Sequence, residues 1–242
     1  AFAFVVAVLA VLLLRNSPGP MGLCPIGDTA AADPPPATSP AAAPPGPTWR
    51  TVYASGAVWH LGFVYIAYGF SYIIYVTFFV KGLMAEGGYT QVGAGRLFMV
   101  MGWSSLLCGL IWGWVSDTIG RKATLVIVYL IQTVAFGLYA LVPHPVGFTI
   151  SAILFGLTAW SIPGIIAAAS GDLFGPRLAP ATLGFVTVFL GVGQAAGPAV
   201  AGMLADARHS LLPAMLLAAV VALLGAGLSA TLHPVHGKRS AT

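Results

Sequence analysis

Charged side chains are scarce in this sequence. Aspartate, glutamate, lysine and arginine make up 7% of the 242 residues, as six acids and ten bases, whereas a soluble domain carries roughly 25%. So few charges cannot cover a water-exposed surface. The composition therefore excludes a cytosolic globular enzyme and a disordered chain. Because the net charge is only +4, it also excludes a nucleic-acid-binding domain.

Cysteine is also rare. Cys24 lies in a proline-rich stretch and Cys108 in an apolar stretch, and neither belongs to a CxxC pair or to a cluster with metal-ligand spacing. We therefore predict no disulfide framework, no metal site and no cofactor.

Hydrophobic residues make up 58% of the chain, and the mean hydropathy is +0.93. About 20 helical residues cross a hydrocarbon core of about 30 Å, and a backbone in lipid must satisfy its own hydrogen bonds. The sequence therefore predicts an all-α, polytopic membrane helix bundle. Six apolar stretches of 20 to 26 residues are long enough to span, at 55–80, 95–115, 123–142, 146–170, 181–204 and 211–232.

A shorter apolar stretch opens the sequence. Residues 1–14 reach about 21 Å, too short to span, and they carry neither an initiator Met nor a basic segment typical of signal peptides. We expect them to be the end of a helix that begins upstream, in a longer protein. Residues 15–50 hold ten of the 18 prolines and are expected to form an extended linker outside the membrane. The six predicted helices then occupy 51–232, and a tail follows at 233–242.

The basic residues predict the orientation, because lysine and arginine favour the cytoplasmic side. With the linker and the C-terminal tail in the cytoplasm, that side receives seven bases and the other side three. The seven are Arg15, Arg50, Arg121, Lys122, Arg177, Lys238 and Arg239, and the three are Lys81, Arg96 and Arg208. We expect the external charges, including Glu86 and Asp206, to lie in solvated loops. The chain is therefore predicted to be an integral membrane protein with its linker and C-terminal tail in the cytoplasm.

The strongest motif lies between the second and third spanning stretches. Its residues Gly113, Asp117, Gly120, Arg121 and Lys122 combine small turn residues with an acid and two bases at facing helix ends. Asp172 ends a later helix on the same side of the membrane, so we predict that it pairs with Arg121. Such a cluster can hold one face closed in one state and release it in another.

This motif resembles the GxxxD(R/K)xGR(R/K) loop of the major facilitator superfamily of secondary transporters. Five positions match, and Thr118 stands where that family often has a base. A finer resemblance, to the uncharacterised YbfB-like bacterial branch, is carried by GFSYIIYVTFFVKG (69–82), WGWVSDTIGRK (112–122), FGLTAWSIPGIIAAASGD (155–172) and GPRLAPATLGF (175–185).

The resemblance implies that the chain is the C-terminal half of such a transporter, from the end of helix 6 to helix 12. A partner N-terminal half of six helices would complete it. The implied activity is secondary active transport of an unidentified small solute by alternating access. The motif would control the opening of the cytoplasmic face, and the implied location is the bacterial plasma (inner) membrane.

Several polar side chains inside the spanning stretches are candidates for a substrate cavity. Tyr65, Tyr68 and Tyr72 share one helix face, either as a cavity wall or as interfacial and packing residues, and Tyr75 is expected near the outer interface. His60 is an intramembrane titratable group, either functional or structural.

Two later stretches add further candidates. Trp160 and Ser161 precede Pro163, which interrupts the helical hydrogen bonds and frees a carbonyl near Trp160, either for a binding site or as a plain kink. Gln194 either bonds a neighbouring helix or contacts substrate.

Small residues recur every four positions in the stretch 181–204. Gly193, Gly197, Pro198 and Gly202 form a pattern similar to the GxxxGPxxxG-type antiporter motif. We interpret it as a packing and hinge element, because small residues let helices approach closely and proline can bend them.

Three other classes of protein are alternatives. A seven-helix receptor or light-driven protein needs a complete first helix, and a retinal protein needs a lysine in the last, which 211–232 lacks. A membrane enzyme needs converging acids, histidines or cysteines, so we predict no catalytic residues. A self-associating half-size transporter is the remaining alternative. The expected surroundings are the lipid bilayer, with no nucleic acid.

Overall fold

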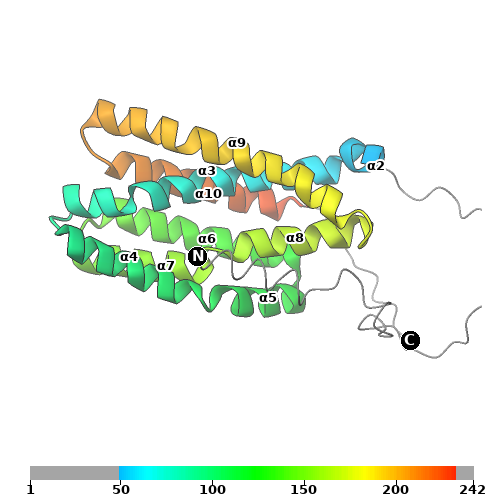
Figure 1. The fold of residues 1–242 in the computed structure, drawn as a ribbon, viewed down its shortest axis with the longest axis horizontal. Helices are drawn as coiled ribbons and strands as arrows, with labels where there is room; N and C mark the ends of the chain where they lie inside the picture. Colours follow the sequence, from blue (N-terminus) through cyan, green and yellow to red (C-terminus); the bar gives the residue numbers. More distant parts are fainter. Residues whose placement is uncertain (1–48, 233–242) are drawn as a thin grey trace, which may run out of the picture. The chain divides into compact units, whose positions relative to one another are not determined.

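The computed structural model describes residues 49–232, and within them the chain folds into helices joined by short loops (Figure 1). The predicted helix end at 1–14, the predicted tail at 233–242 and all but the last two residues of the predicted linker lie outside the described part. Those two residues, Trp49 and Arg50, begin α2. The helices are α2 (Trp49–Ala54), α3 (Gly56–Ala85), α4 (Gln91–Ser105), α5 (Cys108–Ile119), α6 (Arg121–Leu141), α7 (Pro145–Thr158), α8 (Ser161–Phe174), α9 (Ala179–Arg208) and α10 (Leu212–Ala230).

The described helices include enough long, apolar segments for a polytopic membrane bundle. Five helical segments can each cross a bilayer, and the bent pair α4–α5 makes a sixth if it counts as one span. The predicted all-α membrane fold is confirmed.

The α4–α5 segment is not the continuous helix that the apolar stretch 95–115 predicts. It bends by 40° between Ser105 and Cys108. Ser104 Oγ donates to Val100 O at 2.9 Å and Ser105 Oγ donates to Gly102 O at 2.7 Å. Serine hydroxyls that bond carbonyls of the preceding turn compete with the helical hydrogen bonds and favour a bend. The predicted span at 95–115 therefore forms as two helices with a bend between them, which count as one span if taken together.

The α7–α8 segment breaks where Pro163 predicts. Helix α7 ends at Thr158 and α8 begins at Ser161. Proline has no N–H, so the carbonyl of Ala159, four residues earlier, cannot make its usual helical hydrogen bond. Pro198, by contrast, lies inside α9 without interrupting it.

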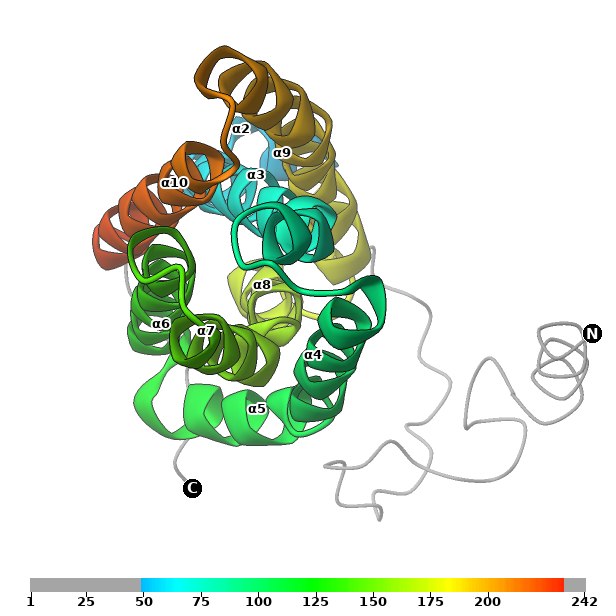
Figure 2. The same cartoon turned by 90° about the vertical axis from the view of Figure 1, so that its left-hand side faces the viewer.

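Helices α3 and α9 pack closely through glycines, with α10 on the other side of α3 (Figure 2). A Cβ added to Gly193 would lie 2.5 Å from Ile66 O, and one added to Gly197 would lie 2.7 Å from Phe70 O. The predicted packing role therefore holds for these two glycines.

A Cβ on Gly202 would meet nothing within 4 Å, so within residues 49–232 the packing interpretation of Gly202 is not supported. The reciprocal glycine on α3 is Gly69, whose Cβ would lie 2.5 Å from Leu190 O.

An aromatic cluster joins α3, α6 and α7. Tyr75 lies at its centre, with ring centroids 4.7 Å from both Phe136 and Phe155 and with its hydroxyl 2.6 Å from Ser151 Oγ. Tyr75 is completely buried, so it packs inside the bundle, and its expected depth near the outer interface stays a prediction. Tyrosine is tolerated here because its hydroxyl finds a partner.

Glu86, expected in a solvated loop, instead joins the end of α3 to the start of α10. Its Oε1 accepts hydrogen bonds from Ser210 Oγ and from the backbone N–H of Leu211, both at 2.8 Å. A carboxylate at a helix N-terminus satisfies a free N–H and interacts favourably with the helix dipole. This contact fixes α10 against α3 at one end of the bundle.

Candidate functional site

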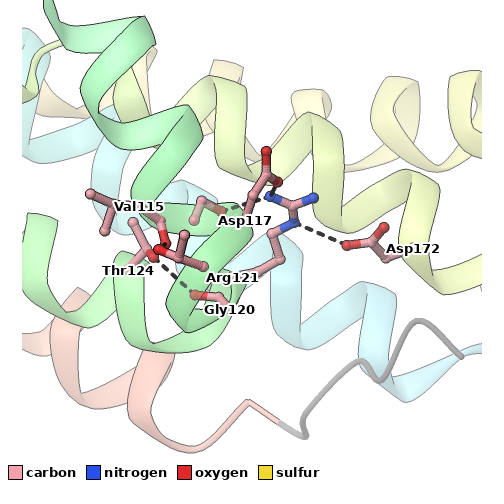
Figure 3. A network of polar contacts seen from close by, with 8 residues as sticks. Val115, Asp117, Gly120, Arg121, Thr124 and Asp172 are labelled. Atoms are coloured by element: carbon pink, nitrogen blue, oxygen red, sulfur yellow. Dashed lines mark hydrogen bonds and ion pairs between the residues drawn. The ribbon is translucent and has the colours of Figure 1, made fainter. Parts of the chain in front are cut away.

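The charged cluster forms at the ends of three helices (Figure 3). Arg121, the first residue of α6, donates from one terminal nitrogen to Asp117 Oδ1 at 2.5 Å and to Ser116 Oγ at 2.9 Å, both on α5. Its Nε donates to Asp172 Oδ2 on α8 at 3.0 Å. The predicted pair between Arg121 and Asp172 is confirmed. One guanidinium therefore links α5, α6 and α8, because its fork of donors can serve two carboxylates at once.

The turn that places Arg121 depends on Gly120. This residue has φ of +92°, a conformation that side chains with a Cβ rarely adopt. The tight turn lets α6 begin directly after α5. Thr124 Oγ1 then donates to Gly120 O at 2.9 Å. Gly113 differs, since a Cβ there would meet nothing within 4 Å.

The cluster lies near the surface, which limits its energy. The side chain of Asp117 is 64% exposed, while those of Arg121 and Asp172 are 25% and 33% exposed. Ion pairs of this exposure contribute about 0–1 kcal/mol each. Such energies are too small to decide folding but sufficient to bias an equilibrium between two conformations. Lys122 is half-buried and makes no ion pair within the described residues.

The second group of candidates meets where α3, α8 and α9 adjoin. The rings of Tyr68 and Tyr72 stack with centroids 4.5 Å apart, and the ring of Tyr72 is 6.5 Å from that of Trp160. The Gln194 amide donates to the Tyr72 hydroxyl. Trp160 is 59% exposed. The structure therefore brings Tyr72, Trp160 and Gln194 together as one partly open surface.

The other predicted cavity residues do not form part of this surface. Tyr65 and Tyr68 are buried behind Tyr72. Ser161 is buried and donates to Thr158 O at 2.7 Å. His60 lies near the end of α10, with its Nε2 3.0 Å from Leu228 O and 3.2 Å from Thr231 Oγ1. These contacts fit the structural interpretation of His60.

Sequence reasoning missed two buried polar residues of α6, of which Gln132 contacts the end of α7. Tyr129 donates from its hydroxyl to Val64 O at 2.5 Å, and Gln132 donates from Nε2 to Thr158 O at 3.3 Å. Gln132 carries the same signal that singled out Gln194, a neutral amide inside an apolar stretch. The buried thiol of Cys108 also reaches the break, where it accepts from the Trp160 N–H at 3.2 Å.

The surface formed by Tyr72, Trp160 and Gln194 offers stacking and hydrogen bonding. Within residues 49–232, no group of three or more His, Cys, Asp or Glu side chains is placed to hold a metal ion. The charged groups that pair, Arg121 with its two carboxylates, lie at helix ends. The two candidate surfaces thus differ in kind, one charged and one aromatic and neutral.

Comparison with known proteins found one family. A family model described as "Uncharacterised MFS-type transporter YbfB" matches residues 30–230. No curated protein matches the chain.

Proposed function

Because the chain belongs to the YbfB-like family of major facilitator superfamily transporters, we propose that it carries a small solute across the membrane by secondary active transport. The family match over residues 30–230 carries this proposal. It supports an integral membrane protein of a transporter family, and it does not favour a seven-helix receptor. The alternating-access mechanism and the solute belong to the proposal.

The arrangement of helices supports a half-transporter. Up to six membrane spans follow one another in the described part, and superfamily transporters are built from two six-helix halves. We assign the chain to the C-terminal half, which works against an N-terminal half. The proposed location is the plasma membrane, with α5–α6 and α8–α9 connected on the cytoplasmic side, because this places seven of ten bases there.

The charged cluster is proposed to bias the two access states. Asp117, Arg121 and Asp172 link three helix ends on one side of the membrane. If the ends separate in one state, both ion pairs are lost in that state alone. A difference of about 1.4 kcal/mol changes the ratio of the states about tenfold, and two exposed ion pairs are of this order.

Tyr72, Trp160 and Gln194 are proposed to contact the solute. The exposed indole offers a stacking surface, and the adjoining hydroxyl and amide offer hydrogen bonds. None of the three side chains carries a charge. These side chains are therefore proposed to bind a planar or apolar group of the solute that carries a polar substituent.

Replacing Trp160 with alanine tests this assignment. In proteoliposomes of the complete transporter, screened with a panel of organic solutes under imposed ion gradients, we expect at least one solute to accumulate. Trp160→Ala should then raise the KM for that solute about tenfold or more, because a stacking surface is lost. The matched control is Trp114→Ala on α5, which is 70% exposed and should leave KM unchanged. Equal effects of the two variants would contradict the assignment, and a panel without any transported solute would count against the function itself.

A further inference from the structure

The described part of the chain has two interrupted spans, α4–α5 and α7–α8, and they meet at their breaks. The turn before each break closes over three residues rather than four. In α4–α5 the Leu106 N–H donates to Trp103 O at 3.2 Å, and in α7–α8 the Ala159 N–H donates to Gly156 O at 3.3 Å. The two turns are neighbours, because a Cβ added to Gly156 would lie 2.5 Å from Met101 O on α4. Tightened turns inside a span often mark a hinge.

Helix α5 holds the α7–α8 break from both sides. Before the break, Trp112 Nε1 on α5 donates to Leu157 O at 2.7 Å. After it, Cys108 Sγ at the start of α5 accepts from the Trp160 N–H at 3.2 Å. Two hydrogen bonds to one helix therefore flank the interruption. The position of α5 thus fixes the angle between α7 and α8 and, with it, the place of Trp160.

The other end of α5 belongs to the charged cluster. Ser116 Oγ and Asp117 Oδ1 both accept from Arg121, which also binds Asp172 on α8. Helix α5 has 12 residues, so at 1.5 Å per residue it reaches about 18 Å. Figure 1 shows it alongside α8, on which it packs. One short helix therefore contacts the charged cluster at one end and the break beside Trp160 at the other.

We propose that α5 transmits changes at the charged cluster to the solute surface, and that Trp112 is the positioning residue of this link. When the ion pairs of Arg121 are lost, α5 tilts at its own break, and its two bonds to the α7–α8 break carry the tilt to Trp160. Hinges let a small change at one site move a distant one. The roles of the two surfaces rest on the proposed function. The competing explanation is a direct link through α8, which runs from the break to Asp172.

The link is tested by measuring the effect of Arg121→Gln with and without the Trp112 donor. The reporter is Gly164→Cys, because Gly164 is exposed, one turn after Trp160, and a Cβ there meets nothing within 4 Å. Its labelling rate with a maleimide is measured in vesicles that hold the complete transporter. In the reporter chain Cys108 is replaced by serine, which keeps an acceptor at this position, and the remaining cysteine of the sequence is also replaced by serine.

With Trp112 present, Arg121→Gln should change the labelling rate at residue 164 about tenfold. Trp112→Phe keeps an aromatic ring but removes the N–H that bonds Leu157 O. In this background Arg121→Gln should change the rate less than about twofold, because the two sites are no longer coupled. A purely structural role of Trp112 would lower stability and leave this ratio unchanged.

Trp114→Phe is the matched control. Trp114 lies on the same helix and is 70% exposed, so its replacement should leave the tenfold effect intact. Cys108→Ala, in place of Cys108→Ser, removes the acceptor of the Trp160 N–H and provides a second variant if Trp112→Phe does not fold. It should reduce the effect of Arg121→Gln to about threefold.

A tenfold effect that persists in either Trp112→Phe or Cys108→Ala would overturn the proposal and assign the link to α8. If Arg121→Gln leaves the labelling rate unchanged even with Trp112 present, the link and the gate are both wrong. Transport is measured separately in proteoliposomes. A chain that transports its solute and keeps the tenfold effect in Trp112→Phe would therefore contradict the link through α5 alone.

Discussion

Gly193→Ala is expected to lower the stability of the bundle more than any other single methyl group added to α9. A Cβ at this position would lie 2.5 Å from Ile66 O and 2.8 Å from Phe70 N, both backbone atoms of α3. Backbone atoms cannot rotate away, so the two helices must separate along their shared interface. Overpacking of this kind costs about 1–3 kcal/mol, against the gain of about 0.5–1 kcal/mol that alanine normally brings to a helix.

The measurement is thermal unfolding in detergent, with Gly202→Ala as the matched control on the same helix. A Cβ at Gly202 meets nothing within 4 Å, so Gly202→Ala should be neutral or slightly stabilising. We expect a lower Tm for Gly193→Ala alone. Equal Tm values for the two variants would show that α3 and α9 do not pack through this glycine.

Arg121→Gln is expected to have the largest effect on function. The substitution removes both ion pairs, with Asp117 and Asp172, and leaves two carboxylates without their shared base. The loss should shift the balance of access states about tenfold and slow transport by a similar factor. Membrane insertion should be normal, because the cluster lies at helix ends.

A cysteine reporter measures the shift without knowledge of the solute. Gly164→Cys is suitable because Gly164 is exposed, one turn after Trp160, and a Cβ there meets nothing within 4 Å. Cys24 and Cys108 would be replaced by serine. We expect Arg121→Gln to change the labelling rate at residue 164 about tenfold.

Two further variants show whether the fork of the guanidinium matters. Arg121→Lys should rescue only part of the effect, because an ammonium group cannot present the planar fork that serves both acids. Arg177→Gln, in the exposed α8–α9 loop, is the control and should behave as the unmodified protein. An unchanged labelling rate and unchanged transport in Arg121→Gln would refute the gating role.

The sequence predicted two kinds of feature: those that depend on the covalent structure of one residue, and those that depend on which side of the membrane a residue lies. Pro163 lacks an N–H, so the α7–α8 break could be placed to within a few residues. Arg121 and Asp172 were assigned to the same side, and opposite charges confined to one rim pair readily. The spacing of Gly193 and Gly197 predicted a close contact between helices. It did not predict which helix would be the partner.

The remaining features depend on packing between distant segments. Whether Glu86 faces water or caps α10 depends on where the α9–α10 loop lies. The α4–α5 bend is favoured by the hydroxyls of Ser104 and Ser105, which donate to carbonyls of their own helix. Hydropathy does not reveal these hydrogen bonds. Gln132 carries the same sequence signal as Gln194, but only the structure shows that its amide contacts Thr158 O on α7.

The central claim is tested most directly by measuring on which side of the membrane the charged cluster lies. Thr118→Cys places a thiol beside Asp117 at an exposed position, and Ala207→Cys places one at the opposite ends of the helices. Both would be labelled with a membrane-impermeant maleimide in right-side-out and inside-out vesicles. We predict that residue 118 reacts from the cytoplasmic side alone and residue 207 from the external side alone. Labelling of residue 118 from outside would contradict the orientation and, with it, the gate assigned to Arg121.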